Sequence, residues 1–170
     1  ISLDRWLKVY YGDLGIALTD TYTSDVFFGQ FDKKLSKLFD GVRHDSGDPI
    51  EFGEKTIAHY ERMGINPLFK TIIFSDGLNS EKVEMITKAF KGRIGLSFGI
   101  GTDLTNDTDL RPMNIVMKLT EISSIDIPWT GVVKLSDEKN KHTGTPRMIE
   151  LAKEMLGLDE IPSHESPIND

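Results

Sequence analysis

The sequence predicts an α/β fold with a parallel sheet that forms part of an irregular (β/α) barrel. Three observations carry this prediction. Short apolar runs end in polar or glycine-rich residues, and these ends lie at Asp20, Asp45, Asp76 and 99–103. The ends recur about every 25 to 30 residues, which is the length of one β–α unit with its loops. The runs also lack polar alternation, as expected for strands with protein on both faces.

Four apolar runs are the predicted strands, and they lie at 14–18, 39–42, 71–74 and 94–98. The predicted helices lie before the first strand, at 2–10, and between the strands, at 24–31, 32–38, 49–63 and 80–90. The helix at 49–63 has the clearest boundaries, because Asp48 can cap it, Pro49 suits its first turn and Gly64 can end it. Glu51 can in addition complete a capping box at the helix start.

The pattern changes towards the C-terminus. Residues 113–122 alternate between apolar and polar side chains, which is typical of a half-exposed antiparallel strand. A turn at 128–131 and a partner strand at 132–135 complete the predicted β-hairpin, and a helix at 145–156 follows. We expect one domain, in which residues 1–110 form the β–α units, 111–158 the C-terminal strands and helix, and 159–170 a flexible tail.

The composition excludes several classes of function. The net charge is −7 and the pI is about 5.1, so the chain has no basic footprint for nucleic acid. Its apolar runs are far too short to cross a membrane, and the absence of cysteine excludes disulfides and thiolate zinc sites. We therefore expect a cytoplasmic protein without nucleic-acid or membrane partners. Binding of small anionic ligands is not excluded, because backbone amides bind phosphate whatever the net charge of the protein.

The run 41–49, with the sequence GVRHDSGDP, is the most informative stretch. It places Arg43, His44 and Asp45 around a Ser-Gly turn between a strand and a helix, the junction at which α/β proteins bind ligands. Arg43 can clamp a phosphate through two nitrogens, and a salt bridge to a nearby carboxylate is the alternative. For Asp45, the alternative to a role in ligand binding is that it only shapes an Asx turn. His44 can act as a base, but the sequence shows no partner for it, and we expect it to support the residues that contact the ligand. The remaining histidines are expected at the surface, namely His59, His142 and His164.

A second candidate is a phosphate cradle at 98–102, with the sequence FGIGT. Paired glycines after a strand let backbone amides face an anion closely, and the hydroxyl of Thr102 adds a donor. A plain turn is the alternative for this segment.

Aspartates at three successive strand ends, Asp20, Asp45 and Asp76, form a third candidate. Their carboxylates can hold ribose hydroxyls, a Mg²⁺ ion or the positive charge that develops on a sugar. Helix capping is the alternative. The segment 134–137, with the sequence KLSD, either reaches the same site or forms a solvated hairpin.

Several of these motifs occur together in one order and resemble the nicotinate phosphoribosyltransferase family. They lie at 14–20, 41–49, 71–76, 98–102 and 134–137. The resemblance extends from residue 1 to about residue 158, and the ordered motifs make it specific. It implies a decorated, irregular (β/α) barrel of the nicotinate/quinolinate phosphoribosyltransferase type. It also implies that nicotinate displaces pyrophosphate from phosphoribosyl pyrophosphate to give nicotinate mononucleotide for NAD synthesis, with ATP as a co-substrate. The cofactor that we expect is Mg²⁺, because hard carboxylate oxygens suit this ion.

By position, the resemblance assigns catalytic roles to Asp45 and Arg43. The residues that would bind substrate are Asp20, Ser46, Gly47, Asp76, Gly77, Gly99, Gly101 and Thr102. The metal ligands stay unassigned. The family's phosphorylated histidine precedes the first strand, and no Gly-Thr-x-x-His motif occurs in this chain, which begins with Ile1. We therefore expect a C-terminal portion of the enzyme that is inactive by itself, and we leave homo-oligomerisation open.

Two alternatives to this function stay open. The chain can belong to another (β/α) barrel enzyme that acts on a phosphorylated sugar without a pyridine. It can also be a non-catalytic module that senses a phosphorylated metabolite.

Overall fold

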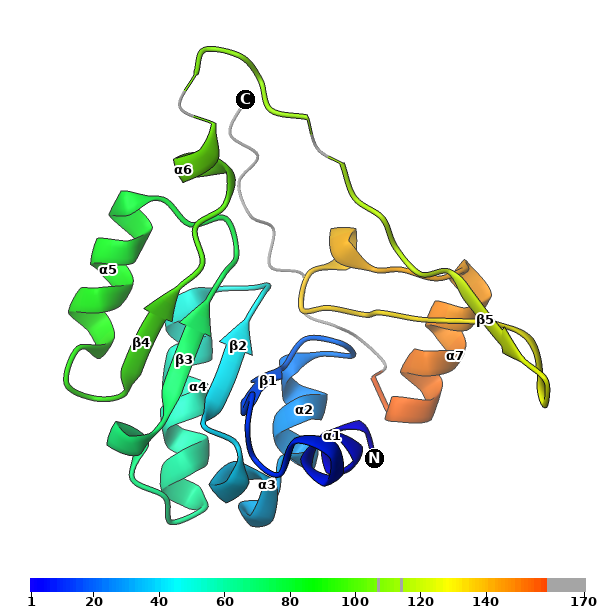
Figure 1. Ribbon diagram of the computed structural model, residues 1–170, viewed down its shortest axis with the longest axis horizontal. Helices are drawn as coiled ribbons and strands as arrows, with labels where there is room; N and C mark the ends of the chain where they lie inside the picture. The colour runs from blue at the N-terminus through cyan, green and yellow to red at the C-terminus, as the bar shows by residue number, and fades with distance from the viewer. Residues whose placement is uncertain (107, 114, 159–170) are drawn as a thin grey trace.

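Four parallel strands form the main sheet of this computed structural model, which describes residues 1–106, 108–113 and 115–158 (Figure 1). The strands are β1 (Ile16–Leu18), β2 (Gly41–His44), β3 (Thr71–Phe74) and β4 (Gly95–Phe98). Their order in the sheet is their order in the sequence, and the register aligns Val42 with Ile72 and Ile72 with Leu96. The predicted parallel sheet is thus confirmed, and its strand ends share one edge.

Helices connect the strands as the sequence predicts. They are α1 (Ser2–Tyr10), α2 (Ser24–Gln30), α3 (Lys33–Leu38), α4 (Pro49–Arg62) and α5 (Ser80–Phe90), and a short 3-10 helix η1 (Pro67–Phe69) precedes β3. Polar side chains cap most of these helices, and Asp48 is the clearest case. Its Oδ1 accepts hydrogen bonds of 2.8 Å from the backbone amides of both Ile50 and Glu51. This cap satisfies two of the amides that the helix itself leaves unpaired, and it fixes the loop that precedes α4.

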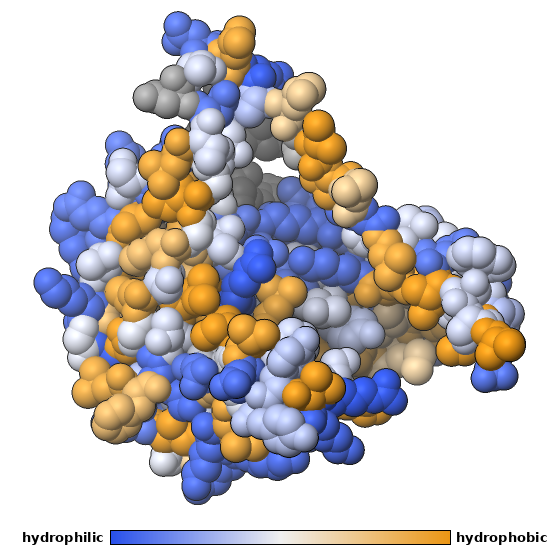
Figure 2. Space-filling model, in the orientation of Figure 1, coloured by the Kyte–Doolittle hydropathy of each residue, from blue (hydrophilic) through white to orange (hydrophobic). Residues whose placement is uncertain are grey.

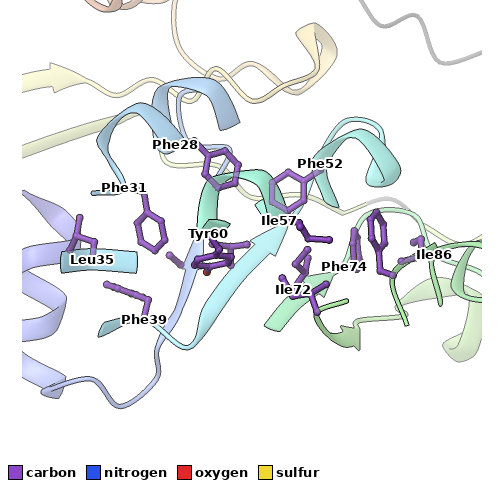
Figure 3. Close-up of a cluster of buried hydrophobic side chains, with 14 of the residues drawn as sticks. Phe28, Phe31, Leu35, Phe39, Phe52, Ile57, Tyr60, Ile72, Phe74 and Ile86 are labelled. Atoms are coloured by element: carbon purple, nitrogen blue, oxygen red, sulfur yellow. The ribbon is translucent and has the colours of Figure 1, made fainter. Parts of the chain in front are cut away.

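The hydrophobic core lies between one face of the sheet and the helices (Figure 3). Val42, Ile72 and Phe74 point from the strands into this core and are fully buried. Helices α4 and α5 approach each other closely, because a Cβ atom added at Gly53 would overlap the ring of Phe90. Burying each such apolar side chain contributes about 1.5–3 kcal/mol, so this layer anchors the strands whose ends form the site.

The other face of the sheet is only partly covered by the described residues. Burial alternates along β2 and β3, where Arg43 is exposed while Thr71 and Ile73 are half buried. The sequence predicted strands covered on both faces, whereas the described helices cover one.

Three strands differ in their boundaries from the prediction: β1 begins at Ile16 instead of residue 14, β4 begins at Gly95 instead of residue 94, and β2 differs most. The second strand was expected at 39–42, but Phe39 is the C-cap of α3 and packs in the core, and β2 spans Gly41–His44. A Cβ atom at Gly41 would overlap the backbone of Thr71, so this glycine lets β2 and β3 pair.

The C-terminal hairpin is also displaced from its predicted position. It consists of β5 (Glu121–Ser124) and β6 (Ile127–Gly131), which pair antiparallel. The expected strand at 113–122 and the expected turn at 128–131 are therefore wrong. Pro128 is tolerated within β6 because each strand of a two-stranded sheet keeps an unpaired edge. The expected partner strand at 132–135 is reduced to a single bridge between Lys134 and Thr143.

An extended segment joins the unpredicted short helix α6 (Thr102–Thr105) to β5, and no regular secondary structure is assigned to its described residues, 108–113 and 115–120 (Figure 1). Its apolar side chains are exposed, as the hydropathy view shows (Figure 2). They are Leu110, Met113, Ile115, Val116, Met117 and Leu119. The alternation of apolar and polar residues in this segment is the pattern of a half-buried strand, but the described residues do not bury these apolar side chains.

A short 3-10 helix η2 (Lys139–Lys141) precedes the final helix α7 (Pro146–Leu156), which matches its prediction. Thr145 caps its start, and Gly157 ends it in the left-handed conformation. The prediction of a flexible tail at 159–170 lies outside the described residues. Within the described part of the chain, every helix is too short or too polar to cross a membrane.

The expectation that His59 lies at the surface is wrong. Its ring is buried beside Phe28 and Phe31, and its nitrogens lie 3.0 Å from Ser36 Oγ and 3.0 Å from an Arg62 guanidinium nitrogen. Burial, together with the positive charge of Arg62, lowers the pKa of His59. Of the other two histidines, His142 is half buried and His164 lies outside the described residues.

Candidate functional site at the carboxyl edge of the sheet

The ends of β2 and β3 bring Arg43, Asp45 and Ser75 into one hydrogen-bonded group. A terminal guanidinium nitrogen of Arg43 donates to Asp45 Oδ1 at 2.8 Å, and Arg43 Nε donates to Ser75 Oγ at 2.8 Å. The Ser75 hydroxyl can in turn donate to Asp45 Oδ1, which lies 3.1 Å away. The guanidinium is thus held by two neighbouring strand ends, while its side chain remains 44% exposed and accessible to a ligand.

The carboxylate of Asp20, at the end of β1, is fully buried. Its Oδ2 accepts hydrogen bonds from Ser46 Oγ at 2.8 Å and from Ser136 Oγ at 3.1 Å, and the ammonium of Lys134 lies 3.0 Å away. Burial raises the pKa of Asp20, but Lys134 and the two hydroxyls outweigh burial, so the net shift is downward. Asp20 therefore stays ionised, and its carboxylate holds Lys134 and the two serine hydroxyls in place.

The segment 134–141 lies across the strand ends and is the unit that gathers this site. Leu135 and Ser136 are completely buried, and the Leu135 amide donates to the Thr21 carbonyl oxygen at 2.9 Å. Asp137 accepts a hydrogen bond of 2.7 Å from the Ser24 amide, at the start of α2. Burial raises the pKa of Asp137, although the hydrogen bonds from Ser24 oppose this shift. The alternative of a solvated hairpin is therefore wrong for this segment.

Lys141, at the end of this segment, pairs with the aspartate that follows β3. Its Nζ donates to Asp76 Oδ1 at 2.6 Å and to the Asp45 backbone carbonyl oxygen at 3.2 Å, and it lies 3.3 Å from Glu138 Oε1. Burial lowers the pKa of Lys141, but Asp76 and Glu138 outweigh burial and raise it overall. The ammonium is therefore a fixed positive charge beside Asp45 and Asp76.

A cavity of about 890 Å³ opens beside these strand ends. The predicted residues that line it are Gly77, Gly99, Gly101 and Thr102. Ser75 lines it as well, so the Arg43–Asp45–Ser75 group borders this cavity. Gly101 precedes the first turn of α6, and a Cβ atom added there would meet no atom within 4 Å. The glycine loop thus presents its backbone to open space, as a phosphate cradle requires.

His44 supports the loop that carries Asp45, as predicted. Its ring is buried between Phe52 and Phe74, and its Nε2 lies 3.1 Å from the carbonyl oxygen of Gly47. Gly47 has a φ of 84°, the left-handed region that favours glycine, and its amide donates to Glu138 Oε1 at 3.0 Å. Burial lowers the pKa of His44, so the ring is neutral at this position.

The structure brings most of the predicted site residues to one edge of the sheet. The predicted site residues did not include three residues that contact them, namely Ser75, Lys134 and Lys141. Ser75 and Lys134 lie in segments that the sequence analysis singled out, next to Asp76 and within KLSD. Lys141 had no local signal, because its partners follow distant strands.

A parallel sheet with charged strand ends and a glycine loop at its carboxyl edge is typical of α/β proteins that bind phosphorylated ligands there. Comparison with known proteins gives the particular family. Residues 1–160 match the nicotinate phosphoribosyltransferase (NAPRTase) family. The chain belongs to this family.

Similar proteins agree with this assignment. The chain is 61% identical to nicotinate phosphoribosyltransferase of Chromohalobacter salexigens over 158 residues, which cover 93% of the chain and 40% of that protein. It resembles the crystal structure of nicotinate phosphoribosyltransferase from Porphyromonas gingivalis with a TM-score of 0.88 and 50% identity, over 92% of this chain and 41% of that one. The corresponding structure from Vibrio cholerae has a TM-score of 0.85 and 39% identity, over 94% of this chain and 39% of that one. The chain thus spans about 40% of the length of the relatives that it matches.

Proposed function

We propose that the chain forms the phosphoribosyl-binding side of a nicotinate phosphoribosyltransferase. The enzyme would form nicotinate mononucleotide and pyrophosphate from nicotinate and phosphoribosyl pyrophosphate, coupled to ATP hydrolysis, in NAD biosynthesis. One observation carries the proposal: the Arg43–Asp45–Ser75 group borders the glycine-lined cavity. Family membership supplies the pyridine substrate, and the geometry supports a site for a sugar phosphate.

The proposed chemistry follows from the charges at the strand ends. The bond between the anomeric carbon and a pyrophosphate oxygen breaks, the pyridine nitrogen bonds to that carbon, and the ribose becomes positively charged in the transition state. Asp45 is fixed by Arg43 and Ser75, so its carboxylate can face this charge without reorganisation. Gly99, Gly101 and Thr102 would hold the 5′-phosphate, and that remote binding orients the ribose.

The remaining substrate-binding assignments are part of the same proposal. Ser46 and Gly47 would shape the loop around Asp45, since Ser46 donates to Asp20 and the Gly47 amide donates to Glu138. Gly77 lines the cavity next to Ser75, and Asp76, between them in the sequence, pairs with Lys141. Asp20 would contribute by holding Lys134.

Mg²⁺ belongs to the proposal as an ion that arrives on the substrate. Among the described residues, no group of three or more acidic, histidine or cysteine side chains is placed to hold a metal ion. Asp20 and Asp76 are paired with lysines, and Asp45 pairs with Arg43 through Oδ1, while its Oδ2 lies 3.9 Å from Lys134 Nζ. Asp45 Oδ2 would hold a Mg²⁺ ion that arrives with its phosphate and water ligands. The ion would supply charge neutralisation for the departing pyrophosphate.

ATP stays a co-substrate in the proposal, and we assign no phosphorylated histidine among the described residues.

The proposal also includes the finer architecture. We propose that the four strands are part of an irregular (β/α) barrel, and that the enzyme is cytoplasmic and can form homo-oligomers. The edge strands β1 and β4 support the barrel, since each pairs on one side only among the described residues. The partly covered sheet face that carries Arg43 would line the barrel interior.

Product formation by the full-length protein tests the proposal. We expect pyrophosphate and nicotinate mononucleotide to appear only when phosphoribosyl pyrophosphate and nicotinate are both present, and ATP to stimulate the reaction. Turnover of a phosphorylated sugar without any pyridine would favour another barrel enzyme. Tight binding of phosphoribosyl pyrophosphate without any product would favour a sensing module.

A further inference from the structure

The three strand-end aspartates face two lysines from one segment, 134–141. Lys134 Nζ lies 3.0 Å from Asp20 Oδ2 and 3.9 Å from Asp45 Oδ2, so one ammonium bridges the ends of β1 and β2. Lys141 Nζ lies 2.6 Å from Asp76 Oδ1, at the end of β3. The three aspartates therefore receive positive charge from a single stretch of chain that is distant from them in the sequence.

The segment holds both ammonium groups in place. The backbone of Lys134 exchanges two hydrogen bonds with Thr143, of 3.0 Å and 2.8 Å. The amide of Lys141 donates to the Glu138 carbonyl oxygen at 3.0 Å. Between these points, buried Leu135 and Ser136 fix the chain against the sheet. Each lysine is about one-third exposed, so its charge is fixed and still acts on the open side of the site.

The charged side chains at this edge of the sheet carry a net negative charge. The carboxylates are those of Asp20, Asp45, Asp76, Asp137 and Glu138, and the cations are Arg43, Lys134 and Lys141. Carboxylates thus outnumber cations even with both lysines in place. An approaching phosphate or pyrophosphate is repelled by every carboxylate that lacks a partner, and this repulsion is weakly screened in a partly buried site.

We propose that Lys134 and Lys141 are positioning residues that neutralise the strand-end aspartates and thereby admit the anionic substrate. This inference rests on the proposed function and adds to it the residues that control access of phosphoribosyl pyrophosphate. The lysines act through Asp20, Asp45 and Asp76, and they leave the affinity for nicotinate, whose single carboxylate carries far less charge, nearly unchanged.

Calorimetric binding to the full-length protein tests this role, with phosphoribosyl pyrophosphate and nicotinate as separate probes. Lys134→Gln and Lys141→Gln should each weaken binding of phosphoribosyl pyrophosphate by roughly tenfold, about the effect of one lost charge-assisted interaction. Nicotinate affinity should change by less than about twofold. Lys134→Arg should retain the affinity because it keeps the charge. Lys139→Gln is the matched control, since Lys139 is exposed in the same segment.

A double variant separates charge from folding. Lys134→Gln combined with Asp20→Asn removes one charge of each sign, and it should recover most of the affinity that Lys134→Gln alone loses. A merely structural role predicts a further loss instead, and either that result or equal weakening of both probes overturns the inference. Wild-type affinity in both lysine variants overturns it as well and leaves the proposed function intact. A wild-type protein that makes no nicotinate mononucleotide contradicts the proposed function itself.

Discussion

The hydroxyl of Ser136 donates to Asp20 Oδ2 at 3.1 Å across 116 residues of sequence. Ser136 has a φ of 60° and is completely buried, so the chain accepts an unfavourable backbone conformation in order to make this contact. The bond ties the segment 134–141 to the first strand end. The site is therefore assembled by tertiary packing, and its geometry depends on the correct docking of the C-terminal segment.

Substitution of Gly101 tests the phosphate cradle without disturbing the fold. Gly101→Ala places a Cβ atom where no protein atom lies within 4 Å, so thermal stability should stay unchanged. Affinity for phosphoribosyl pyrophosphate should fall by at least about tenfold, because the methyl group enters the space that the phosphate would occupy. Calorimetry and thermal melting of the full-length protein measure both effects.

Gly41→Ala is the control for a glycine substitution that disturbs the fold. Its Cβ atom would overlap the backbone of Thr71, so it should destabilise the protein whether or not ligand is present. Unchanged ligand affinity in Gly101→Ala would place the phosphate elsewhere.

Two helical glycines test the packing that supports the sheet. Gly53→Ala should lower the free energy of unfolding by about 1–3 kcal/mol, because the new methyl group collides with the Phe90 ring. Gly29→Ala, where a Cβ atom meets nothing within 4 Å, should raise it by about 0.5–1 kcal/mol through better helix propensity. Denaturant titrations of the full-length variants give both values, and a free energy of unfolding that does not fall in Gly53→Ala would refute the packing described for α4 and α5.

Buried histidines should make stability depend on pH. Burial lowers the pKa of both His44 and His59 below the ordinary 6.5, so the unfolded chain binds protons more readily than the folded protein. Their stabilisation is fully present above pH 6.5 and is lost as pH falls through their lowered pKa values in the folded state. The denaturant midpoint should therefore decrease between about pH 7.5 and about pH 5.5.

A non-titrating variant assigns part of this dependence. His44→Gln can still donate to the Gly47 carbonyl oxygen but cannot take up a proton, so its midpoint should vary less with pH than that of the wild type. Parallel profiles for the two proteins would show that His44 does not contribute.

The elements that sequence reasoning located correctly are governed by local chemistry. Asp48 and Pro49 start α4. The short apolar segments between the helices bury their side chains by pairing as strands of one sheet. Because parallel strands end at the same edge, the order of strands and helices along the chain is enough to bring Arg43, Asp45 and Asp76 together.

The remaining features depend on contacts that leave no local pattern. Residues 113–122 alternate like a strand, but the hairpin forms at Glu121–Ser124 and Ile127–Gly131, where the two strands find each other. Lys141 reaches Asp76 across 65 residues, and nothing in its neighbours marks it as part of a site. His59 looked like a surface residue on a helix, yet Ser36 and Arg62 satisfy its ring in the core.

The turnover of Asp45→Asn in the full-length protein tests the central claim most directly, namely that the strand ends of this chain carry the transfer chemistry. Asparagine keeps the shape and the Oδ1 acceptor for Arg43 and Ser75 but removes the negative charge. We expect kcat for nicotinate mononucleotide formation to fall by about two orders of magnitude, as for loss of one preorganised electrostatic group. Affinity for nicotinate should stay within about threefold of wild type, since Asp45 acts on the ribose in the transition state. A kcat close to that of the wild type would contradict the claim.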